Sequence, residues 1–288
     1  MQQLLIIKLV VGFLMLLTAV VFILNFRACK EVLSKIDKLK TFLMAFIANF
    51  FDTFGIGSFS SFFAMRNIFK LMPDNQTYNG SLVIQAALPT AMQSILFLGL
   101  INIDTITLLV SCVSIASGGI ISGYLVKYVS KRAILGVMLT TFAISAILII
   151  LNKLHLLNIG GELTSVRGDK LIILAVVMLI AGGLPAFGVG YYSIVLVVIF
   201  MLGVSPVVAY PIMTTASAVQ MPMTAIPMIK NRQFLSVSTL LMTIAGTIAV
   251  LIAAPIISKI SSSELKWVLL VVLGYNITQL VKQLRKKA

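Results

Sequence analysis

The sequence has 288 residues, of which 60% are hydrophobic and only 10% charged, and its mean hydropathy is +1.11. A soluble globular domain cannot bury this much apolar surface, so the composition excludes the soluble classes and indicates a polytopic membrane protein in a lipid bilayer. The net charge of +14 does not indicate nucleic-acid binding, because most lysines and arginines lie in short segments beside apolar runs. The positive-inside bias of membrane proteins accounts for that placement.

Seven apolar runs are long enough, at about 20 residues each, to cross a hydrocarbon layer about 30 Å thick. No ten-residue alternation of apolar and polar residues occurs, and a span must satisfy its own backbone hydrogen bonds in lipid, so we expect helices and not barrel strands. The predicted spans are Leu4–Phe26, Asn79–Leu100, Ile103–Val126, Ala133–Leu151, Pro206–Ile229, Ser236–Ile257 and Lys266–Val281.

Two further segments, Thr41–Lys70 and Leu171–Gly203, are too long for one span and too short for two. Each contains the pattern Phe-Gly-x-Gly-x-x-Ser, at residues 54–60 and 187–193, with an offset of 133 residues. A second match pairs Gln93 with Gln220 in the next helix, and three spans follow each interrupted segment. We therefore expect an N-terminal helix with a basic loop (1–40), repeat 1 (41–151), a linker (152–170) and repeat 2 (171–288).

The distribution of basic residues predicts the orientation of these segments. If each interrupted segment enters the membrane and returns to its own side, most of the 22 lysines and arginines lie on one face. If each crosses once, the cluster Lys127–Arg132 moves to the other face, so the positive-inside rule favours the re-entrant hairpin. The N-terminus is then outside and the C-terminus cytoplasmic, and the two repeats are inverted, as in alternating-access transporters.

The paired glycine-centred interruptions, each followed by three spans, resemble the sulfite exporter TauE/SafE family of membrane permeases, over the chain after residue 40. Members of that family usually carry a denser glycine run than Gly55-Ile56-Gly57-Ser58 and Gly188-Val189-Gly190-Tyr191. The resemblance implies a two-repeat helical bundle in the cytoplasmic membrane. It also implies transport of small sulfur-containing anions such as sulfite or organosulfonates.

The two interruptions are candidates for an anion site. A broken helix exposes unpaired N–H groups and the positive end of a half-helix dipole, which attract an anion without any arginine. Hydroxyl and amide side chains nearby supply further donors. The alternative is that these small residues only allow close helix packing. The candidate substrate-binding residues are Gly55, Gly57, Ser58, Ser60, Gln93, Gly188, Gly190, Tyr191, Tyr192, Ser193 and Gln220.

Asp52 is the acidic residue that we place deep in the apolar region, where a charge costs at least about 3 kcal/mol on insertion scales. Its possible roles are a proton carrier that couples transport, a sodium ligand, or an N-cap of the half-helix that follows. The matching position in the second repeat is Pro185, so any coupling role belongs to one repeat alone.

Other polar features indicate no separate site. Cys29, Cys112 and His155 are far apart in sequence, so we expect no metal site and no cofactor. Gly119 and Gly123 are four residues apart on one helix face, which favours helix packing. The linker Asn152–Lys170 has the composition of a solvated connection, with a gate or anion funnel as the alternative.

The sequence therefore predicts a secondary transporter for a small anion, and not an enzyme. No Gly-x-x-x-x-Gly-Lys-Ser/Thr motif occurs, so the driving force would be a gradient, with H⁺ or Na⁺ as the coupling ion. The alternatives are a channel or an accessory subunit of a larger complex. An intramembrane enzyme is disfavoured, because it needs a nucleophile with a base, paired carboxylates or metal ligands at membrane depth.

Overall fold

The computed structural model describes residues 2–54, 57–72, 74–98, 103–154, 156, 162–259 and 262–285, and nearly all of them are helical. The one β pairing among these residues is an isolated bridge between Leu163 and Val204. Six of the described helical segments are long and apolar enough to cross a membrane. The expectation of an all-α, multi-pass membrane protein is confirmed.

The described chain contains the following α-helices. They are α1 (Gln2–Asn25), α2 (Lys35–Thr53), α3 (Ser58–Phe69), α4 (Asn75–Phe97), α5 (Thr105–Leu125), α6 (Lys131–Lys153), α7 (Asp169–Gly183), α8 (Tyr192–Met201), α9 (Pro206–Lys230), α10 (Ser236–Ala253) and α11 (Ser262–Arg285). Short 3₁₀ turns extend four of them, namely η1 (Phe26–Ala28), η2 (Val126–Tyr128), η3 (Leu184–Phe187) and η4 (Ala254–Lys259).

Five of the seven predicted spans coincide with segments able to cross a membrane, which are Leu5–Ala28, Gln76–Phe97, Thr105–Tyr128, Arg132–Asn152 and Ser236–Ile256. The sixth such segment, Asp169–Phe187, is the first part of the second interrupted segment. The other two predicted spans coincide with α9 and α11, which are helices of 25 and 24 residues outside this group of six.

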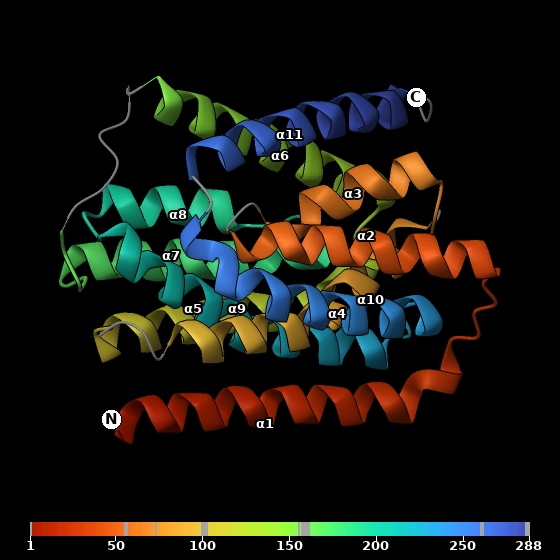
Figure 1. Cartoon of the computed structure of the whole chain (residues 1–288), viewed down its shortest axis with the longest axis horizontal. Coiled ribbons are helices and arrows are strands. Elements are labelled where there is room, and N and C mark those ends of the chain that lie inside the picture. The colour runs from red at the N-terminus through yellow and green to blue at the C-terminus, as the bar shows by residue number, and fades with distance from the viewer. Residues whose placement is uncertain are drawn as a thin grey trace.

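The bundle is centred on α4 and α9, which pack against each other. On one side α5 packs on α9 and α7, and on the other side α10 packs on α4 and α2. The helix α1 lies along one edge of the bundle against α9 and α4, while α6 and α11 pack together at the opposite edge (Figure 1). Small polar side chains line the centre, where Ser94 Oγ donates to Thr215 Oγ1 at 3.1 Å, as is common between membrane helices.

Both predicted interruptions coincide with gaps between helices. The first gap separates Thr53 at the end of α2 from Ser58 at the start of α3, and Gly57 there has φ +83°. In the second, η3 ends at Phe187, Gly188 has the left-handed φ of +81°, and α8 begins at Tyr192. Glycine adopts these positive φ values without the steric cost that a Cβ imposes, which explains why the helices break at these residues.

Four helix starts are fixed by local capping. Ser34, Asp74, Asp104 and Ser130 each accept a hydrogen bond from the backbone N–H three residues later. The helix α10 is capped from a distance, because Glu31 accepts hydrogen bonds from Ser238 N at 2.8 Å and Ser238 Oγ at 2.5 Å. The segment after α1 is thereby attached to the start of α10.

Candidate functional site: two helix breaks that meet at Asp52

The two helix breaks pack against each other inside the bundle. A Cβ placed on Gly57 would lie 3.9 Å from Tyr192 Cβ, and one placed on Gly190 would lie 3.4 Å from Phe59 Cβ. These two contacts are reciprocal, because the offset of 133 residues relates Gly57 to Gly190 and Phe59 to Tyr192. The start of α3 therefore faces the start of α8, and a side chain larger than a methyl group at either glycine would crowd this contact.

Asp52, in the last turn of α2, connects the two sides of the first break through its side chain. Its side chain is only 6% exposed. Asp52 Oδ1 accepts a hydrogen bond from Ser58 N at 2.6 Å, and Oδ2 accepts one from Gln93 Nε2 at 3.0 Å. The first N–H groups of a helix have no partner within the helix, so this carboxylate caps α3 from the preceding helix. It occupies the position at which a helix N-terminus binds an anion.

A small cavity lies between the two breaks. Its volume is about 20 Å³, which is room for about one water molecule. The cavity is lined by Asp52, Gly57, Ser58, Phe59, Ala86, Thr90, Gly190, Tyr191, Tyr192 and Met221. Residues from α2, α3, α4, α8 and α9 therefore converge on one small space in the bundle.

Hydroxyl groups of the second half of the chain complete the surroundings. The Tyr191 hydroxyl is hydrogen-bonded to Ser217 Oγ, which donates to Tyr192 OH at 3.0 Å. Tyr210 OH donates to the carbonyl oxygen of Phe54 at 2.6 Å, at the end of α2. These bonds join α8 and α9 to the first break, so the polar groups of both breaks form one buried cluster.

The start of α8 differs from the start of α3 in having no carboxylate. Pro185 stands where Asp52 stands in the first interruption. No described side chain accepts a hydrogen bond from the first turn of α8, whose N–H groups follow Gly190 at the wall of the cavity. The aligned N–H groups at this end carry a partial positive charge that favours an anion.

The predicted site residues do not all reach the cavity. Asp52, Gly57, Ser58, Gly190, Tyr191 and Tyr192 line it, and Gln93 contacts it through Asp52. Ser60 is buried, but its hydroxyl donates to Gly57 O at 3.3 Å. Gly188 packs against Asn79, and Gln220 Nε2 donates to Gly182 O at 3.0 Å, which joins α9 to α7. Gly55 and the side chain of Ser193 lie outside the described part of the chain.

Sequence reasoning did not find four polar residues of this cluster, which are Thr53, Thr90, Tyr210 and Ser217. A signal for two of them was present. Thr90 lies three residues before Gln93, and Ser217 lies three residues before Gln220, so each hydroxyl shares a helix face with the matched glutamine. Tyr210 carried no such signal.

The groups around Asp52 are uncharged. The titratable side chains that act on its carboxylate are the phenols of Tyr191 and Tyr192, at the start of α8, and of Tyr210 on α9. In the described part of the chain, no lysine or arginine forms an ion pair with it. The carboxylate is therefore held by hydrogen bonds alone, in a region where a bare charge is costly.

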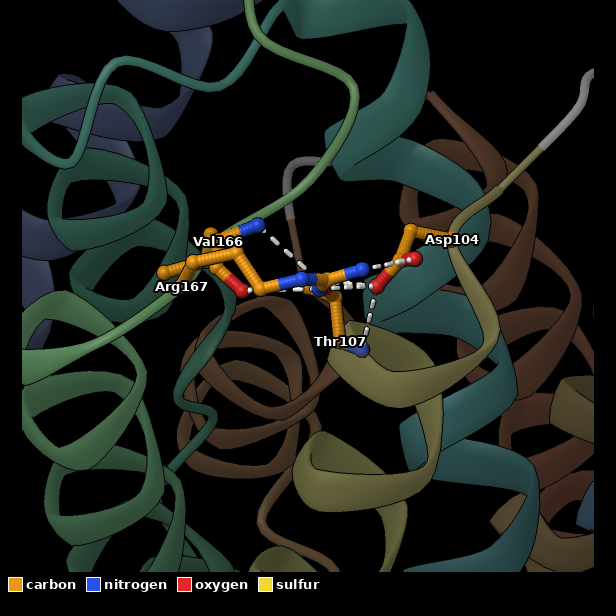
Figure 2. A network of polar contacts seen from close by, with 4 residues as sticks. All are labelled: Asp104, Thr107, Val166 and Arg167. Atoms are coloured by element: carbon orange, nitrogen blue, oxygen red, sulfur yellow. Dashed lines mark hydrogen bonds and ion pairs between the residues drawn. The ribbon is translucent and has the colours of Figure 1, made fainter.

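The linker between the two halves is attached at the end of the bundle where α5 begins. Figure 2 shows Arg167 donating two hydrogen bonds to Asp104, at 2.5 and 2.6 Å, beside a bond of 3.0 Å from Val166 N to Thr107 Oγ1. The Arg167 guanidinium holds the pKa of the Asp104 carboxyl well below its ordinary range. Residue Leu163 also bonds to the turn before α9, so the described part of this linker is fixed at both ends.

Comparison of the chain with models of protein families, with curated proteins and with solved structures gives no match.

Proposed function

We propose that this protein is a secondary transporter that moves a small anion across the cytoplasmic membrane by alternating access. The observation that carries the proposal is the reciprocal contact between the two helix breaks around Asp52 and its cavity. In membrane proteins, non-helical backbone at membrane depth is tolerated only where protein buries it or a watery cavity meets it. Discontinuous helices that meet near the bundle centre are a common construction of substrate sites in carriers.

The packing of the helices supports two inverted repeats, each a re-entrant hairpin followed by three spans. The helices α2–α6 of the first half correspond in order to α7–α11 of the second half, so that α2 matches α7 and α6 matches α11. When each helix is exchanged for its counterpart, the contact between α5 and α9 becomes the contact between α10 and α4. The same exchange turns α5 with α7 into α10 with α2, and α3 with α11 into α8 with α6, whereas α4 with α9 and α6 with α11 map onto themselves. A duplicated unit with a two-fold axis gives this pattern.

The course of the chain supports the orientation. In Figure 1 the chain enters α2 from the end of the bundle where α1 finishes, and it enters α7 from the opposite end. The two termini also lie at opposite ends, which agrees with an N-terminus outside and a cytoplasmic C-terminus. If each interrupted segment returns to its own side, the chain crosses the membrane an odd number of times, so its two termini lie on opposite sides. The basic loops then lie together on the cytoplasmic face.

The donor groups support an oxyanion as the substrate. The N–H groups at the start of α8, for which no described side chain is an acceptor, are hydrogen-bond donors without a fixed positive charge. The hydroxyls of Tyr191, Tyr192 and Ser217 are further donors of this kind. The TauE/SafE resemblance points to sulfite or a sulfonate within this class. The cavity is smaller than such an anion, so binding requires the starts of α3 and α8 to separate.

Flux measurements with the purified protein in liposomes test the proposal. We expect saturable uptake and counterflow of labelled sulfite, sulfoacetate or taurine, with acetate as the carboxylate control. Flux that rises linearly with concentration and shows no counterflow would instead indicate a channel. Chemical conversion of the labelled compound would indicate an enzyme, and the absence of any flux would indicate an accessory subunit.

A further inference from the structure

We propose that the transported anion and the Asp52 carboxylate occupy the N-terminus of α3 alternately, so that the anion binds only after Asp52 has taken up a proton. The inference rests on the carrier function proposed above and names its coupling ion. The protein would then be a symporter of one proton with one small oxyanion.

The first support is the position of the carboxylate. Asp52 Oδ1 lies 2.6 Å from Ser58 N, and this N–H group at the start of α3 is one that an oxyanion would also bind. A charged carboxylate and a substrate anion cannot share this position, because two negative groups in a dry interior repel strongly. A protonated carboxyl group is a much weaker acceptor, and the anion can displace it.

The second support is an unused acceptor beside the carboxylate. Gln93 is fully buried, and its Nε2 donates to Asp52 Oδ2, while its Oε1 has no hydrogen-bond partner among the described groups. A half-turn of the amide exchanges these two atoms. Gln93 Oε1 would then accept a hydrogen bond from a protonated Asp52, so the same glutamine can bind both protonation states of the carboxyl group.

The third support is that, among the described residues, no other group near Asp52 changes its charge around neutral pH. The phenols of Tyr191, Tyr192 and Tyr210 face Asp52 from α8 and α9, and a phenol ordinarily stays protonated at neutral pH. The helix α10, which packs on α2, contains no titratable residue, and α3 carries its single charged residue, Arg66, in its last turn. The helix α4, which carries Gln93, has one further phenol, Tyr78, and the Cys112 thiol on α5 faces Tyr191. Both groups are ordinarily uncharged at neutral pH. Asp52 is therefore the group through which pH acts on the cavity.

The transport step balances in charge. A proton from the solution on one side binds an Asp52 carboxylate oxygen, the anion takes the N–H groups at the start of α3, and both leave on the other side. Transfer of a monovalent anion then moves no net charge. Because Pro185 replaces the carboxylate in the second repeat, the site holds one proton for each anion.

Proton uptake by the purified full-length protein tests the inference directly. Methanesulfonate is a suitable probe, because its charge does not change near neutral pH. We expect its binding, in weakly buffered detergent solution, to remove about one proton from solution for each anion bound by the wild type. Asp52→Asn is expected to bind methanesulfonate without proton uptake. Asp104→Asn removes a capping carboxylate that does not line the cavity, and it should behave as the wild type.

Accumulation of methanesulfonate in liposomes is the second test. At zero membrane potential, an inward proton gradient of one pH unit should accumulate methanesulfonate about tenfold in liposomes with the wild type. The reason is that, with one proton per anion, the concentration ratio of the anion comes to equal that of the proton. Asp52→Asn should only equalise the concentrations. Gln93→Leu, which removes the amide that bonds both forms of Asp52, should shift the pH of half-maximal proton uptake.

The outcomes separate the two proposals. Anion binding without proton uptake in the wild type, accumulation driven by a sodium gradient alone, or pH-driven accumulation in Asp52→Asn would each overturn the symport inference and leave the carrier function standing. No saturable flux of methanesulfonate, sulfite, sulfoacetate or taurine by the wild type would overturn the carrier function, and the symport inference with it.

Discussion

At the residue scale, Gly57 and Gly190 hold matched positions in the two breaks but have different backbones. Gly57 has φ +83°, a value that residues with a Cβ rarely adopt, whereas the φ of Gly190 lies outside that range. Both glycines leave space for the opposite break, at 3.9 and 3.4 Å from the neighbouring Cβ atoms. A substitution at Gly57 therefore strains the backbone, and one at Gly190 only tightens a contact.

This difference predicts unequal losses of stability. We expect Gly57→Ala to lower the free energy of unfolding by about 1–3 kcal/mol, the cost of holding a side chain in such a conformation. Gly190→Ala should cost less, because its Cβ would lie at van der Waals contact distance from Phe59 and its φ is outside the strained range. Thermal unfolding in detergent measures the difference, and a larger loss for Gly190→Ala would contradict it.

In transport, Gly57→Leu and Gly190→Leu should each reduce the flux by more than they reduce the yield of folded protein.

Asp104 carries a prediction about pH. Its pKa is lowered in the folded protein by Arg167, so the ion pair stabilises the fold fully above the ordinary aspartate pKa of about 4. That contribution decreases as the pH falls below this value toward the lowered pKa of the folded state. The Tm difference between wild type and Asp104→Asn should therefore be largest at pH 7 and markedly smaller at pH 3. A difference that grows on acidification would contradict the role of the pair.

At the element scale, α5 is held at unusually short range by α7 and α9. A Cβ on Gly118 would overlap the carbonyl oxygen of Leu179, and one on Gly182 would overlap that of Ile115. The predicted packing role of Gly119 and Gly123 is confirmed, because both lie against α9. Glycine at these positions lets two helix backbones touch, which is how membrane helices gain dispersion energy without a hydrophobic driving force.

The close contacts predict that added methyl groups separate these helices. Gly118→Ala and Gly182→Ala should each lower the free energy of unfolding by about 1–3 kcal/mol, since a backbone carbonyl cannot move out of the way as a flexible side chain can. Gly136→Ala on α6 is the matched control, because no described atom apart from the backbone of its own helix lies within 4 Å of its Cβ position. That variant should be neutral or more stable by up to about 1 kcal/mol, as alanine favours a helix. Equal effects at all three positions would contradict the packing explanation.

At the scale of the whole molecule, the contact between the breaks joins the two halves of the chain. If transport requires the starts of α3 and α8 to separate, a covalent link between them must stop it. The Cβ distances of 3.9 Å for residues 57 and 192, and 3.4 Å for residues 59 and 190, are close to those of disulfides.

Paired cysteines test this movement. In a background with Cys29→Ser and Cys112→Ala, we expect the pair Gly57→Cys with Tyr192→Cys, and the pair Phe59→Cys with Gly190→Cys, to form disulfides. Oxidation should abolish transport in both, and a reductant should restore it to the level of the reduced protein. Each single cysteine variant is the control. Full transport by a protein shown to be cross-linked would exclude separation of the breaks.

The sequence by itself determined the membrane class, the approximate spans and the positions of the two helix breaks. These features depend on local properties, namely the length of apolar runs and the freedom of glycine at positive φ. The candidate site was predictable in part, because Gly57, Gly190 and their neighbours repeat at a fixed offset. From the sequence, the capping role of Asp52 is one of three alternatives, and the hydrogen bond from Ser58 N to Asp52 Oδ1 establishes it.

Only the tertiary structure decided which polar groups meet. Gln93 and Gln220 match in sequence, yet one bonds to Asp52 and the other to Gly182 on α7. Tyr210 reaches the end of α2 although 156 residues separate it from Phe54, and Arg167 attaches the linker to Asp104. Such partners depend on how helices far apart in the chain cross, and small residues with little sequence signal set those crossings. The sequence shows which polar residues are present, but only the packing of the helices brings them together around one buried carboxylate.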